Sequence, residues 1–283
     1  KAIAVSVDSS ANYCKSHPIT GGKQIVCENW RNLISVGAKP LAITNCLNFG
    51  NPENENVMGE FAECLEGIKK ACEFLNYPVV SGNVSFYNGT NKKNINPTPV
   101  IGGVGLINKL SKPMSHNFKK EKSVIILIGK TFGHLEQSCF LKENYSIIDG
   151  MPPEINLLNE KNNGENILKL IQNNLLLSVH DVSSGGLIVA LSEMSISSNY
   201  GIKIQKPKKL ANLFEYFFGE DQGRYILEVD INNLTKTEKI LKDNNIYYEN
   251  IGFTQKDFFE IEEEIKINVK DLAKINNEWY NNY

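Results

Sequence analysis

Short apolar runs alternate with amphipathic segments along the first third of the chain. Four of these runs have the length expected of buried strands: residues 2–7, 41–47, 79–84 and 100–107. Between them, residues 21–36 and 55–75 carry apolar side chains at three- and four-residue steps, which is the spacing of an amphipathic helix. Gly37 follows the first helix where a C-cap glycine is expected. The alternation predicts a domain built from strands and helices.

A second block of the same kind begins after residues 108–123, a segment with Pro113 and a run of charged residues that predicts a linker. Strands are expected at residues 124–128, 175–179, 201–204, 224–229, 247–251 and 258–262. Helices are expected at residues 159–174, 185–195, 237–245 and 271–280. At roughly 150 residues per domain, a chain of 283 residues also predicts two domains.

Composition narrows the class of protein. Lys plus Arg number 30 and Asp plus Glu number 32, so the formal net charge is −2, and a nucleic-acid partner bound through a broad basic face is not expected. The longest aliphatic runs fall far short of the roughly 20 residues that span a bilayer, so no membrane partner is expected. The N-terminus shows no signal peptide and no Met, which is consistent with a piece of something longer.

The six cysteines and four histidines do not form metal-binding patterns. None of the cysteines belongs to a C-x-x-C pair, and the histidines show no pair at ligand spacing, so a structural zinc site is not expected. Most of the cysteines lie in apolar stretches and are interpreted as reduced side chains. A cytoplasmic location follows from that interpretation.

Two polar stretches follow predicted strands. Residues 81–88 (Ser-Gly-Asn-Val-Ser-Phe-Tyr-Asn) and residues 45–52 (Asn-Cys-Leu-Asn-Phe-Gly-Asn-Pro) combine glycines with neutral oxygen donors. Glycine permits close backbone approach to a ligand, and amide and hydroxyl oxygens suit hard cations and phosphates. Ordinary strand ends followed by turns account for the same residues, and each stretch taken alone favours that interpretation.

Two further stretches lie in the second block. Residues 180–187 (His-Asp-Val-Ser-Ser-Gly-Gly-Leu) form a strand-to-helix turn that either holds an anion at the helix start or is capped by Ser183 or Ser184. Residues 218–225 (Phe-Gly-Glu-Asp-Gln-Gly-Arg-Tyr) either bind a polar ligand or form a solvated turn. The chain contains no Walker A sequence, no G-x-S-x-G elbow and no H-E-x-x-H helix, so a self-contained acyl-transfer site is not predicted.

Taken together, these stretches resemble phosphoribosylformylglycinamidine synthase, the ATP-dependent amidine-forming enzyme of purine biosynthesis. The resemblance is carried in order over essentially the whole chain by residues 30–32, 37–44, 47–52, 80–85, 97–99, 102–105, 180–187 and 219–225. The chain is similar to the C-terminal half of the synthetase subunit in the multi-subunit bacterial form. The combination is far more specific than any one segment.

The resemblance implies an α/β (α+β) fold, namely one two-domain half of the aminoimidazole-ribotide-synthetase-like fold. Residues 1–117 would carry the ATP and magnesium loops and contribute to a shared β-barrel. Residues 118–283 would form an α/β sandwich. The family's catalytic His lies in the N-terminal half, so the resemblance implies no catalytic residue in this chain and no activity of the chain alone.

The resemblance also assigns site residues. Asn45 and Gly82 would contact ATP, Asn83 would bind magnesium, and Ser85 would contact the formylglycinamide ribotide. The physical chemistry agrees, because an amide oxygen is a hard ligand for Mg²⁺ and glycine admits a nucleotide close to the backbone. Asn83 and Ser85 lie two residues apart, so in an extended strand their side chains face the same way.

Three positions depart from the family pattern. Asn45, Ser184 and Gly89 stand where the family usually has acidic residues. Each removes one carboxylate from a candidate site, although Asn45 retains an acceptor and gains donors toward a nucleotide.

The implied reaction joins ammonia to the ribotide. ATP phosphorylates the amide oxygen of the formylglycinamide group, and ammonia then displaces phosphate to leave the amidine. Positioning and charge neutralisation dominate phosphoryl transfer. The implied partners are the missing N-terminal half, a glutaminase subunit that supplies ammonia, and a small bridging subunit.

Two alternatives remain. Another ATP-using enzyme of the same superfamily, such as a selenophosphate synthetase or thiamine-phosphate kinase, would share the fold without sharing the substrate. A non-catalytic nucleotide-binding or assembly module is motivated by the three lost carboxylates. Without the domain that completes the barrel, the first domain would leave an apolar face exposed, so self-association is expected.

Overall fold

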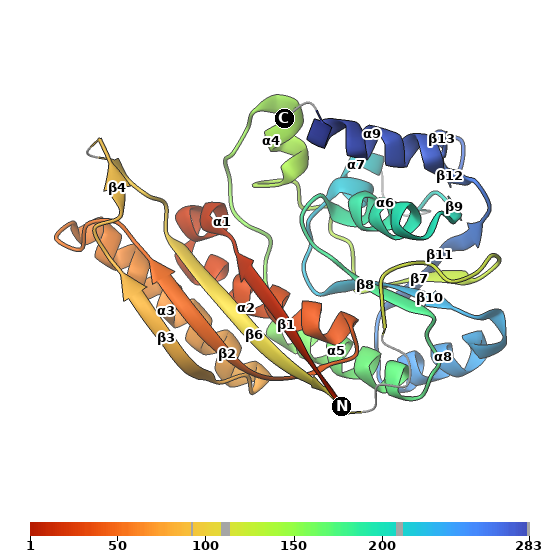
Figure 1. Ribbon diagram of the computed structural model, residues 1–283, viewed down its shortest axis with the longest axis horizontal. Coiled ribbons are helices and arrows are strands. Elements are labelled where there is room, and N and C mark those ends of the chain that lie inside the picture. The colour runs from red at the N-terminus through yellow and green to blue at the C-terminus, as the bar shows by residue number, and fades with distance from the viewer. Residues whose placement is uncertain (92, 109–113, 208–211, 282–283) are drawn as a thin grey trace.

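The computed structural model describes residues 1–91, 93–108, 114–207 and 212–281, and it contains two large β-sheets with helices packed on them (Figure 1). The first sheet has four strands in the order β1-β6-β2-β3. These strands are β1 (Ala2–Ser9), β2 (Lys39–Asn48), β3 (Val79–Ser85) and β6 (Thr98–Ile107). Strand β6 is antiparallel to both of its neighbours, β1 and β2, whereas β2 and β3 are parallel. A small hairpin, β4 (Gly89–Thr90) and β5 (Lys93–Asn94), follows β3.

Three helices belong to the first sheet: α1 (Ala11–Ser16), α2 (Pro18–Ser35) and α3 (Glu55–Leu75). Helix α2 begins with Pro18, whose fixed φ suits the first helical position, and His17 accepts a hydrogen bond from the backbone N–H of Thr20. Helix α3 is capped by Asn54 and ends at Asn76, which adopts the left-handed conformation with φ 53°. Helix α2 packs on α3, on the sheet and on the second domain, so it is the element shared by both halves of the molecule.

Side chains alternate strictly between the two faces of β1. Ala4, Ser6 and Asp8 face α2, where Asn29 and Asn32 donate hydrogen bonds to the Asp8 carboxylate at 2.8 Å each. Ile3, Val5 and Val7 point the other way and are 71, 68 and 67% exposed. One face of the first sheet is therefore covered by helices, and the opposite face, called the open face below, carries exposed aliphatic residues.

The second sheet has seven strands in the order β13-β12-β9-β11-β7-β10-β8. The strands are β7 (Val124–Ile128), β8 (Ser178–Val182), β9 (Gly201–Ile204), β10 (Arg224–Val229), β11 (Tyr248–Gln255), β12 (Phe258–Ile261) and β13 (Ile265–Asn268). The accompanying helices are α4 (Cys139–Tyr145), α5 (Leu157–Gln172), α6 (Gly186–Ser198), α7 (Leu213–Phe218), α8 (Ile231–Asp243) and α9 (Val269–Asn281). In Figure 1, α6, α7 and α9 lie above this sheet and α5 and α8 lie below it.

The two faces of the second sheet feed two separate hydrophobic cores. Ile126 and Ile128 of β7 join a core that continues through α5 and α2 into the first domain. Ile125 and Leu127 of the same strand join a second core under α6, α7 and α9. Strand β7 is a continuous apolar run because both of its faces are covered, so burial rather than alternation determines its sequence.

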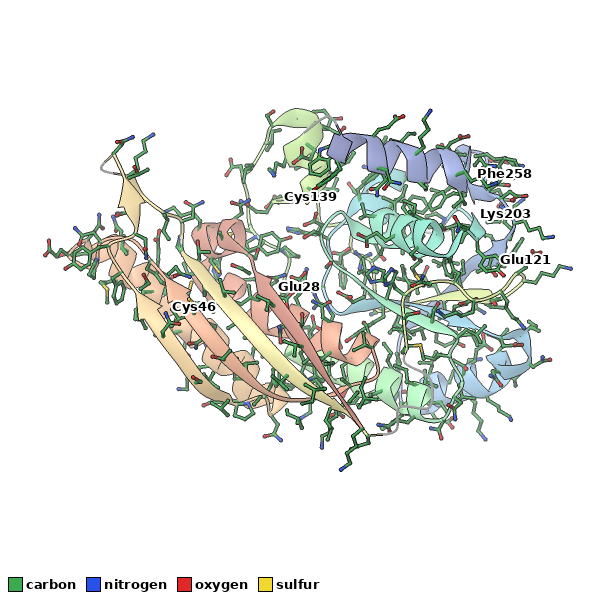
Figure 2. All side chains as sticks on the ribbon, viewed as in Figure 1. Glu28, Cys46, Glu121, Cys139, Lys203 and Phe258 are labelled. Atoms are coloured by element: carbon green, nitrogen blue, oxygen red, sulfur yellow. The ribbon has the colours of Figure 1, made fainter. Side chains whose placement is uncertain are left out.

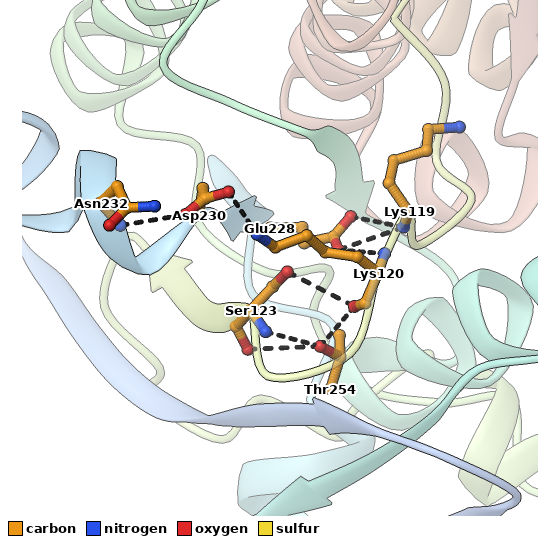
Figure 3. A network of polar contacts seen from close by, with 7 residues as sticks. All are labelled: Lys119, Lys120, Ser123, Glu228, Asp230, Asn232 and Thr254. Carbon is orange, nitrogen blue, oxygen red and sulfur yellow. Dashed lines mark hydrogen bonds and ion pairs between the residues drawn. The ribbon is translucent and has the colours of Figure 1, made fainter.

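The segment that enters the second domain is anchored by buried polar contacts (Figure 3). The Glu228 carboxylate accepts hydrogen bonds from the backbone N–H of Lys119 at 2.9 Å and of Lys120 at 3.2 Å. The Thr254 hydroxyl donates to the Lys120 carbonyl at 2.7 Å and accepts from the Ser123 N–H at 2.8 Å. The expected linker at residues 108–123 thus ends as a fixed segment; its residues 109–113 lie outside the described ranges.

Several element boundaries differ from the prediction. The strand expected at residues 175–179 begins at Ser178, because Leu175 and Leu176 are buried in the turn after α5. The helix expected at residues 237–245 begins earlier, at Ile231, where Asp230 caps it through the N–H of Asn232. Helices α1, α4 and α7 and strand β13 were not predicted. Within the described ranges, no helix has the length and apolarity needed to cross a membrane.

Candidate functional site

The parallel pairing of β2 with β3 brings the four predicted site residues together. The register pairs are Asn45 with Gly82, Cys46 with Asn83, and Asn48 with Ser85. Asn48 and Ser85 are the last residues of their strands. The two polar stretches singled out in the sequence are therefore neighbours at the carboxyl ends of two adjacent parallel strands, which is where ligands bind in many α/β proteins.

Asn45 and Gly82 lie on the face of the sheet that carries the helices. A Cβ built at Gly82 would be 1.9 Å from the Asn45 Oδ1, so the Asn45 side chain occupies the space that a side chain at position 82 would need. Asn45 also lines a pocket of about 660 Å³ between α3 and the start of β3. The other lining residues are mainly apolar, Leu65 and Val79 among them, and the charged ones are Glu66, Lys69 and Glu73.

Asn83 and Ser85 lie on the open face instead, since side chains alternate along β3. Their neighbours on β2 are Cys46 and Asn48, whose side chains share that face. Figure 2 shows Cys46 on this sheet. The four predicted residues are thus adjacent in the sheet but divided between its two faces, with the backbone of Gly82 between them.

Cys46, Asn48 and Asn88 were not assigned roles from the sequence. The alternation of β2 already carried the signal for the first two, because residues 44, 46 and 48 must share a face. Asn48 Nδ2 donates to the carbonyl oxygens of Cys46 and Thr98 at 3.2 Å each, so the end of β2 is fixed on β6. Asn88 contacts the Ser85 hydroxyl with Nδ2 at 3.1 Å, a contact across a turn that the sequence pattern does not show.

Gly89, one of the three departures, leaves no room for a side chain. A Cβ at this position would lie 2.5 Å from the carbonyl oxygen of Lys93 in the paired strand β5. A carboxylate at position 89 is therefore incompatible with this hairpin, and the absence of an acidic residue there is a matter of backbone packing as well as of charge.

Glu220 and Asp221, the two acidic residues of the stretch 218–225, make structural contacts. Glu220 accepts hydrogen bonds from the Tyr13 hydroxyl at 2.7 Å and from the N–H groups of Cys139 and Gly185 at 2.8 Å each. The Asp221 carboxylate accepts from three successive N–H groups, at residues 132–134, at 2.9 to 3.3 Å. The solvated-turn interpretation of residues 218–225 is wrong, because Glu220 and Asp221 are buried.

The turn at residues 180–187 also differs from the capping interpretation. Helix α6 is preceded by Gly185, with φ 81°, and neither Ser183 nor Ser184 caps it through a side chain. Burial opposes the charged form of the His180 ring, but hydrogen bonds to Asp181 and Glu193 outweigh it and raise its pKa to about 9. Ser184 lines a small pocket of about 260 Å³ between the two domains.

A buried ion pair joins the two domains. Arg31 on α2 contacts Glu160 on α5 at 2.7 Å, with side chains 0 and 1% exposed, and also donates to the Gln222 Oε1 at 2.7 Å. Glu28, one turn before Arg31, is shown in Figure 2 where the first domain meets the second. Burial raises the pKa of Glu28 to about 7, although Arg31 acts in the opposite direction. The charged side chains at this interface are therefore oriented mainly by contacts with other residues of the protein.

Among the described residues, no group of three or more His, Cys, Asp or Glu side chains is arranged to hold a metal ion. The donors around Asn83 are neutral amide and hydroxyl oxygens. Such a set fits Mg²⁺ only when water and phosphate oxygens supply most of its ligands, which is the usual situation for Mg²⁺ bound with a nucleotide.

Comparison with known proteins identifies two matching family models. Residues 1–107 match "AIR synthase related protein, N-terminal domain", and residues 120–261 match "AIR synthase related protein, C-terminal domain". Among curated proteins, phosphoribosylformylglycinamidine synthase subunit PurL of Pelagibacter ubique is 54% identical over all 283 residues, which cover 39% of that relative. The corresponding subunit of Rhodopseudomonas palustris is 42% identical over 283 residues and is covered to 38%.

Solved structures give the same fold. T. maritima PurL complexed with FGAR has a TM-score of 0.79 at 17% identity, with 96% of this chain and 46% of that chain covered. The complex of the same protein with ATP has a TM-score of 0.77 at 16% identity, with 96 and 44% covered. A thiamine-monophosphate kinase from Stenotrophomonas maltophilia has a TM-score of 0.68 at 13% identity, with 93 and 86% covered.

These comparisons confirm two sequence predictions. The resemblance to phosphoribosylformylglycinamidine synthase extends over the whole chain, and the mixed α/β fold agrees with that of the solved structures. The chain spans about two fifths of the length of the curated relatives that it matches, 39 and 38% in the two cases given.

Proposed function

Because the chain belongs to the AIR synthase related protein family, we propose that it is the C-terminal half of a phosphoribosylformylglycinamidine synthase subunit. The complete enzyme would convert formylglycinamide ribotide, ammonia and ATP to formylglycinamidine ribotide, ADP and phosphate. The observation that carries the proposal is the register of β2 and β3, which places Asn45 beside Gly82, Cys46 beside Asn83 and Asn48 beside Ser85. We further propose that residues 1–117 and 118–283 are the two domains.

The proposed nucleotide site combines an amide with a bare backbone. Asn45 would hydrogen-bond ATP, and Gly82 would let the nucleotide approach the edge of β3 without meeting a side chain. The pocket of about 660 Å³ beside Asn45 supports this role, since its volume falls in the range of small-molecule sites. T. maritima PurL complexed with ATP shares this fold, which supports ATP as the nucleotide.

On the open face, Asn83 would offer its amide oxygen to magnesium and Ser85 would contact the ribotide. When bound, Mg²⁺ supplies charge neutralisation for phosphoryl transfer. Asn83 and Ser85 share a face of one strand, so they would hold magnesium and the ribotide near each other, and orientation of the reacting groups is itself a large part of catalysis. The structure with FGAR supports the ribotide as substrate, since that complex shares the fold.

The proposed mechanism assigns binding, and not proton transfer, to this chain. ATP would phosphorylate the amide oxygen of the ribotide, and ammonia would then displace phosphate. The catalytic His would come from the N-terminal half, and ammonia from a separate glutaminase subunit joined through a small bridging subunit. The free cysteines, four of which are buried, agree with the proposed cytoplasmic location.

A second candidate function rests on the departures from the family pattern. Asn45 lacks the charge of an acidic residue, Ser184 lies in a pocket between the domains, and Gly89 has no room for a side chain. A nucleotide site that binds ATP without turnover would fit these features. The thiamine-monophosphate kinase match represents a third, fold-level alternative with a different substrate.

Calorimetric titration of magnesium-ATP separates these functions. The chain is titrated alone and then together with the remaining part of the subunit, and ATP turnover is measured with formylglycinamide ribotide and ammonia. Turnover that requires both compounds supports the synthase. Binding without turnover in the complete assembly supports the structural nucleotide site, and turnover with thiamine phosphate in place of the ribotide supports the kinase.

A further inference from the structure

We propose that Asn88 is a positioning residue that fixes the hydroxyl group of Ser85 and joins the loops after β2 and β3. This inference deepens the proposed function, because it rests on Ser85 as a substrate contact. Asn88 lies three residues beyond Ser85, in the turn between β3 and the β4–β5 hairpin. It is the last residue of the polar stretch 81–88, in which the sequence pattern gave it no role of its own.

The Asn88 amide makes contacts that determine its orientation. Its Nδ2 lies 3.0 Å from the carbonyl oxygen of Phe49 and 2.9 Å from the carbonyl oxygen of Ser85. Carbonyl oxygens only accept hydrogen bonds, so the nitrogen and not the oxygen of the amide must face them. The two protons of the NH₂ group are thereby directed to one loop residue after β2 and one strand residue of β3.

This orientation determines what Ser85 presents to a ligand. The Ser85 Oγ lies 3.3 Å from Asn88 Oδ1 and 3.1 Å from Nδ2. Since both amide protons are directed to carbonyl oxygens at 3.0 Å or less, the hydroxyl proton is left to be donated to Oδ1. One lone pair of the Ser85 Oγ accepts from Nδ2 at 3.1 Å, and the other leaves the hydroxyl able to accept a hydrogen bond from a ligand.

The surrounding backbone supports the same arrangement. The N–H of Phe49 donates to the Ser85 carbonyl at 2.9 Å, and the N–H of Tyr87 donates to the Gly50 carbonyl at 2.9 Å. Tyr87 has φ 59°, a left-handed conformation that is unusual for a residue with a side chain and that turns the chain so that Asn88 reaches back to Phe49. A strained backbone conformation of this kind persists where several neighbouring contacts hold the loop in one arrangement.

Below the loops, an aromatic layer completes the support. The rings of Phe49 and Phe86 each pack edge-on against Phe61 of α3, with centroids 5.1 and 5.2 Å apart. Phe49 and Phe86 belong to the two loops that Asn88 joins, and α3 lies beneath both. The loops thus rest on one rigid helix, and Asn88 adds the polar connection on the side of Ser85.

The test uses the complete subunit with its partners and four variants: Asn88→Ala, Ser85→Ala, the double variant, and Asn94→Ala. Asn94 is the matched control, because its Oδ1 supports the same loops by accepting from the Asn51 N–H at 3.0 Å without contacting Ser85. Asn88→Ala is expected to raise KM for the ribotide about tenfold and to leave KM for ATP within twofold. The double variant is expected to match Ser85→Ala, because Asn88 acts through Ser85. Equal rises in both KM values, or additive effects, would overturn the proposal.

Hydrogen exchange in the same complete protein tests the loop connection separately from activity. Asn88→Ala is expected to speed exchange of the Phe49 and Tyr87 amides at least tenfold, while Ser85→Ala leaves it unchanged. Unchanged protection in Asn88→Ala would overturn the inference. If the wild-type assembly shows no ribotide-dependent turnover, the proposed function fails, and the exchange result still decides whether Asn88 holds the loops.

Discussion

Close contact between Gly82 and Asn45 determines what the residue at position 82 can be. Replacing Gly82 with Ala would place a methyl group 1.9 Å from the Asn45 Oδ1, so the Asn45 side chain must move. Gly82→Ala is therefore expected to weaken magnesium-ATP binding at least tenfold in calorimetry on the complete subunit. The fold should persist, because β3 is an exposed strand at the end of the sheet order.

Gly59→Ala is the matched control for this substitution. Gly59 lies on α3 with open space around its missing Cβ, so alanine is expected to stabilise the helix by roughly 0.5–1 kcal/mol and to leave ATP binding unchanged. Adding Asn45→Ala to Gly82→Ala removes the clash without restoring the amide contact. If Gly82→Ala binds ATP like the wild type, Gly82 does not lie at the nucleotide site.

Half-buried Glu28 predicts a specific dependence of stability on pH. Burial raises its pKa from the ordinary 4.5 to about 7, so the folded state binds more protons than the unfolded state between these values. The contribution of Glu28 to the free energy of unfolding is therefore present at low pH and is lost as pH rises toward 7. In Glu28→Gln this loss is absent.

Denaturant unfolding of both proteins between pH 4.5 and pH 7.5 measures the effect. The stability of Glu28→Gln relative to the wild type is expected to rise with pH by at most about 3 kcal/mol, which is the shift multiplied by 1.36 kcal/mol per unit. A difference that stays constant over this range would show that Glu28 titrates normally. Glu165→Gln, which makes the same substitution at an exposed position of α5, is the control.

At this scale the sequence indicated the two stretches of the candidate site but not the two faces on which their side chains lie. Glycine and neutral oxygen donors after apolar strands indicated residues 45–52 and 81–88, and their pairing follows from parallel strands. Asn45 and Gly82 lie on one face of the sheet, and Asn83 and Ser85 lie on the other. Which face each pair takes depends on which residues of β2 and β3 point toward the helices. The Asn88 contact depends on the left-handed turn at Tyr87, which nothing in the local pattern marks.

Elements with strong periodicity were predicted best. Helix α3 has the expected bounds because its apolar residues recur at helical spacing, and strands β7, β9 and β10 have them because they are buried along almost their whole length. Helices α1 and α7 have 6 residues each, too few for a helical period to be visible. The β4–β5 hairpin pairs through its backbone, and its polar side chains gave no alternating signal.

Strand β10 illustrates how one buried polar residue anchors an element. Glu228 accepts hydrogen bonds from two backbone N–H groups and from the Ser178 hydroxyl at 2.9 Å. Burial raises its pKa, while these bonds act in the opposite direction. Its carboxylate connects three segments: the entry to the second domain, β8 and β10.

Glu228→Gln is therefore expected to lower the free energy of unfolding by roughly 1–3 kcal/mol, since an NH₂ group would face N–H donors that lose their acceptor. Chemical denaturation at pH 7 measures the change. Glu238→Gln on α8 is the control, because it removes the same charge at a more exposed position. It should alter the free energy of unfolding by less than about 0.5 kcal/mol. Equal effects of the two substitutions would contradict an anchoring role for Glu228.

The whole molecule is asymmetric in how its two sheets are covered. The second sheet has helices on both faces, and α2 and α5 join it to the first domain through Arg31 and Glu160. The first sheet keeps an open face on which β1 and β6 place aliphatic residues side by side: Ile3 opposite Leu106 and Val5 opposite Val104. A contiguous exposed apolar surface of this kind favours association.

The 283-residue chain on its own is therefore expected to self-associate through this open face. Light scattering over a range of concentrations should show a mass that rises with concentration, because burying exposed aliphatic side chains yields roughly 25 cal/mol per Å². Val5→Lys places a charge at a position that is 68% exposed and should shift the chain toward the monomer without loss of folding. Ile231→Lys, at a 57% exposed position at the start of α8, introduces the same charge away from the open face and should leave association unchanged.

Adding the remaining part of the subunit should suppress self-association of the wild type, since the proposed barrel would bury the same strands. A chain that stays monomeric at high concentration, or equal effects of the two lysine substitutions, would show that the open face does not drive association.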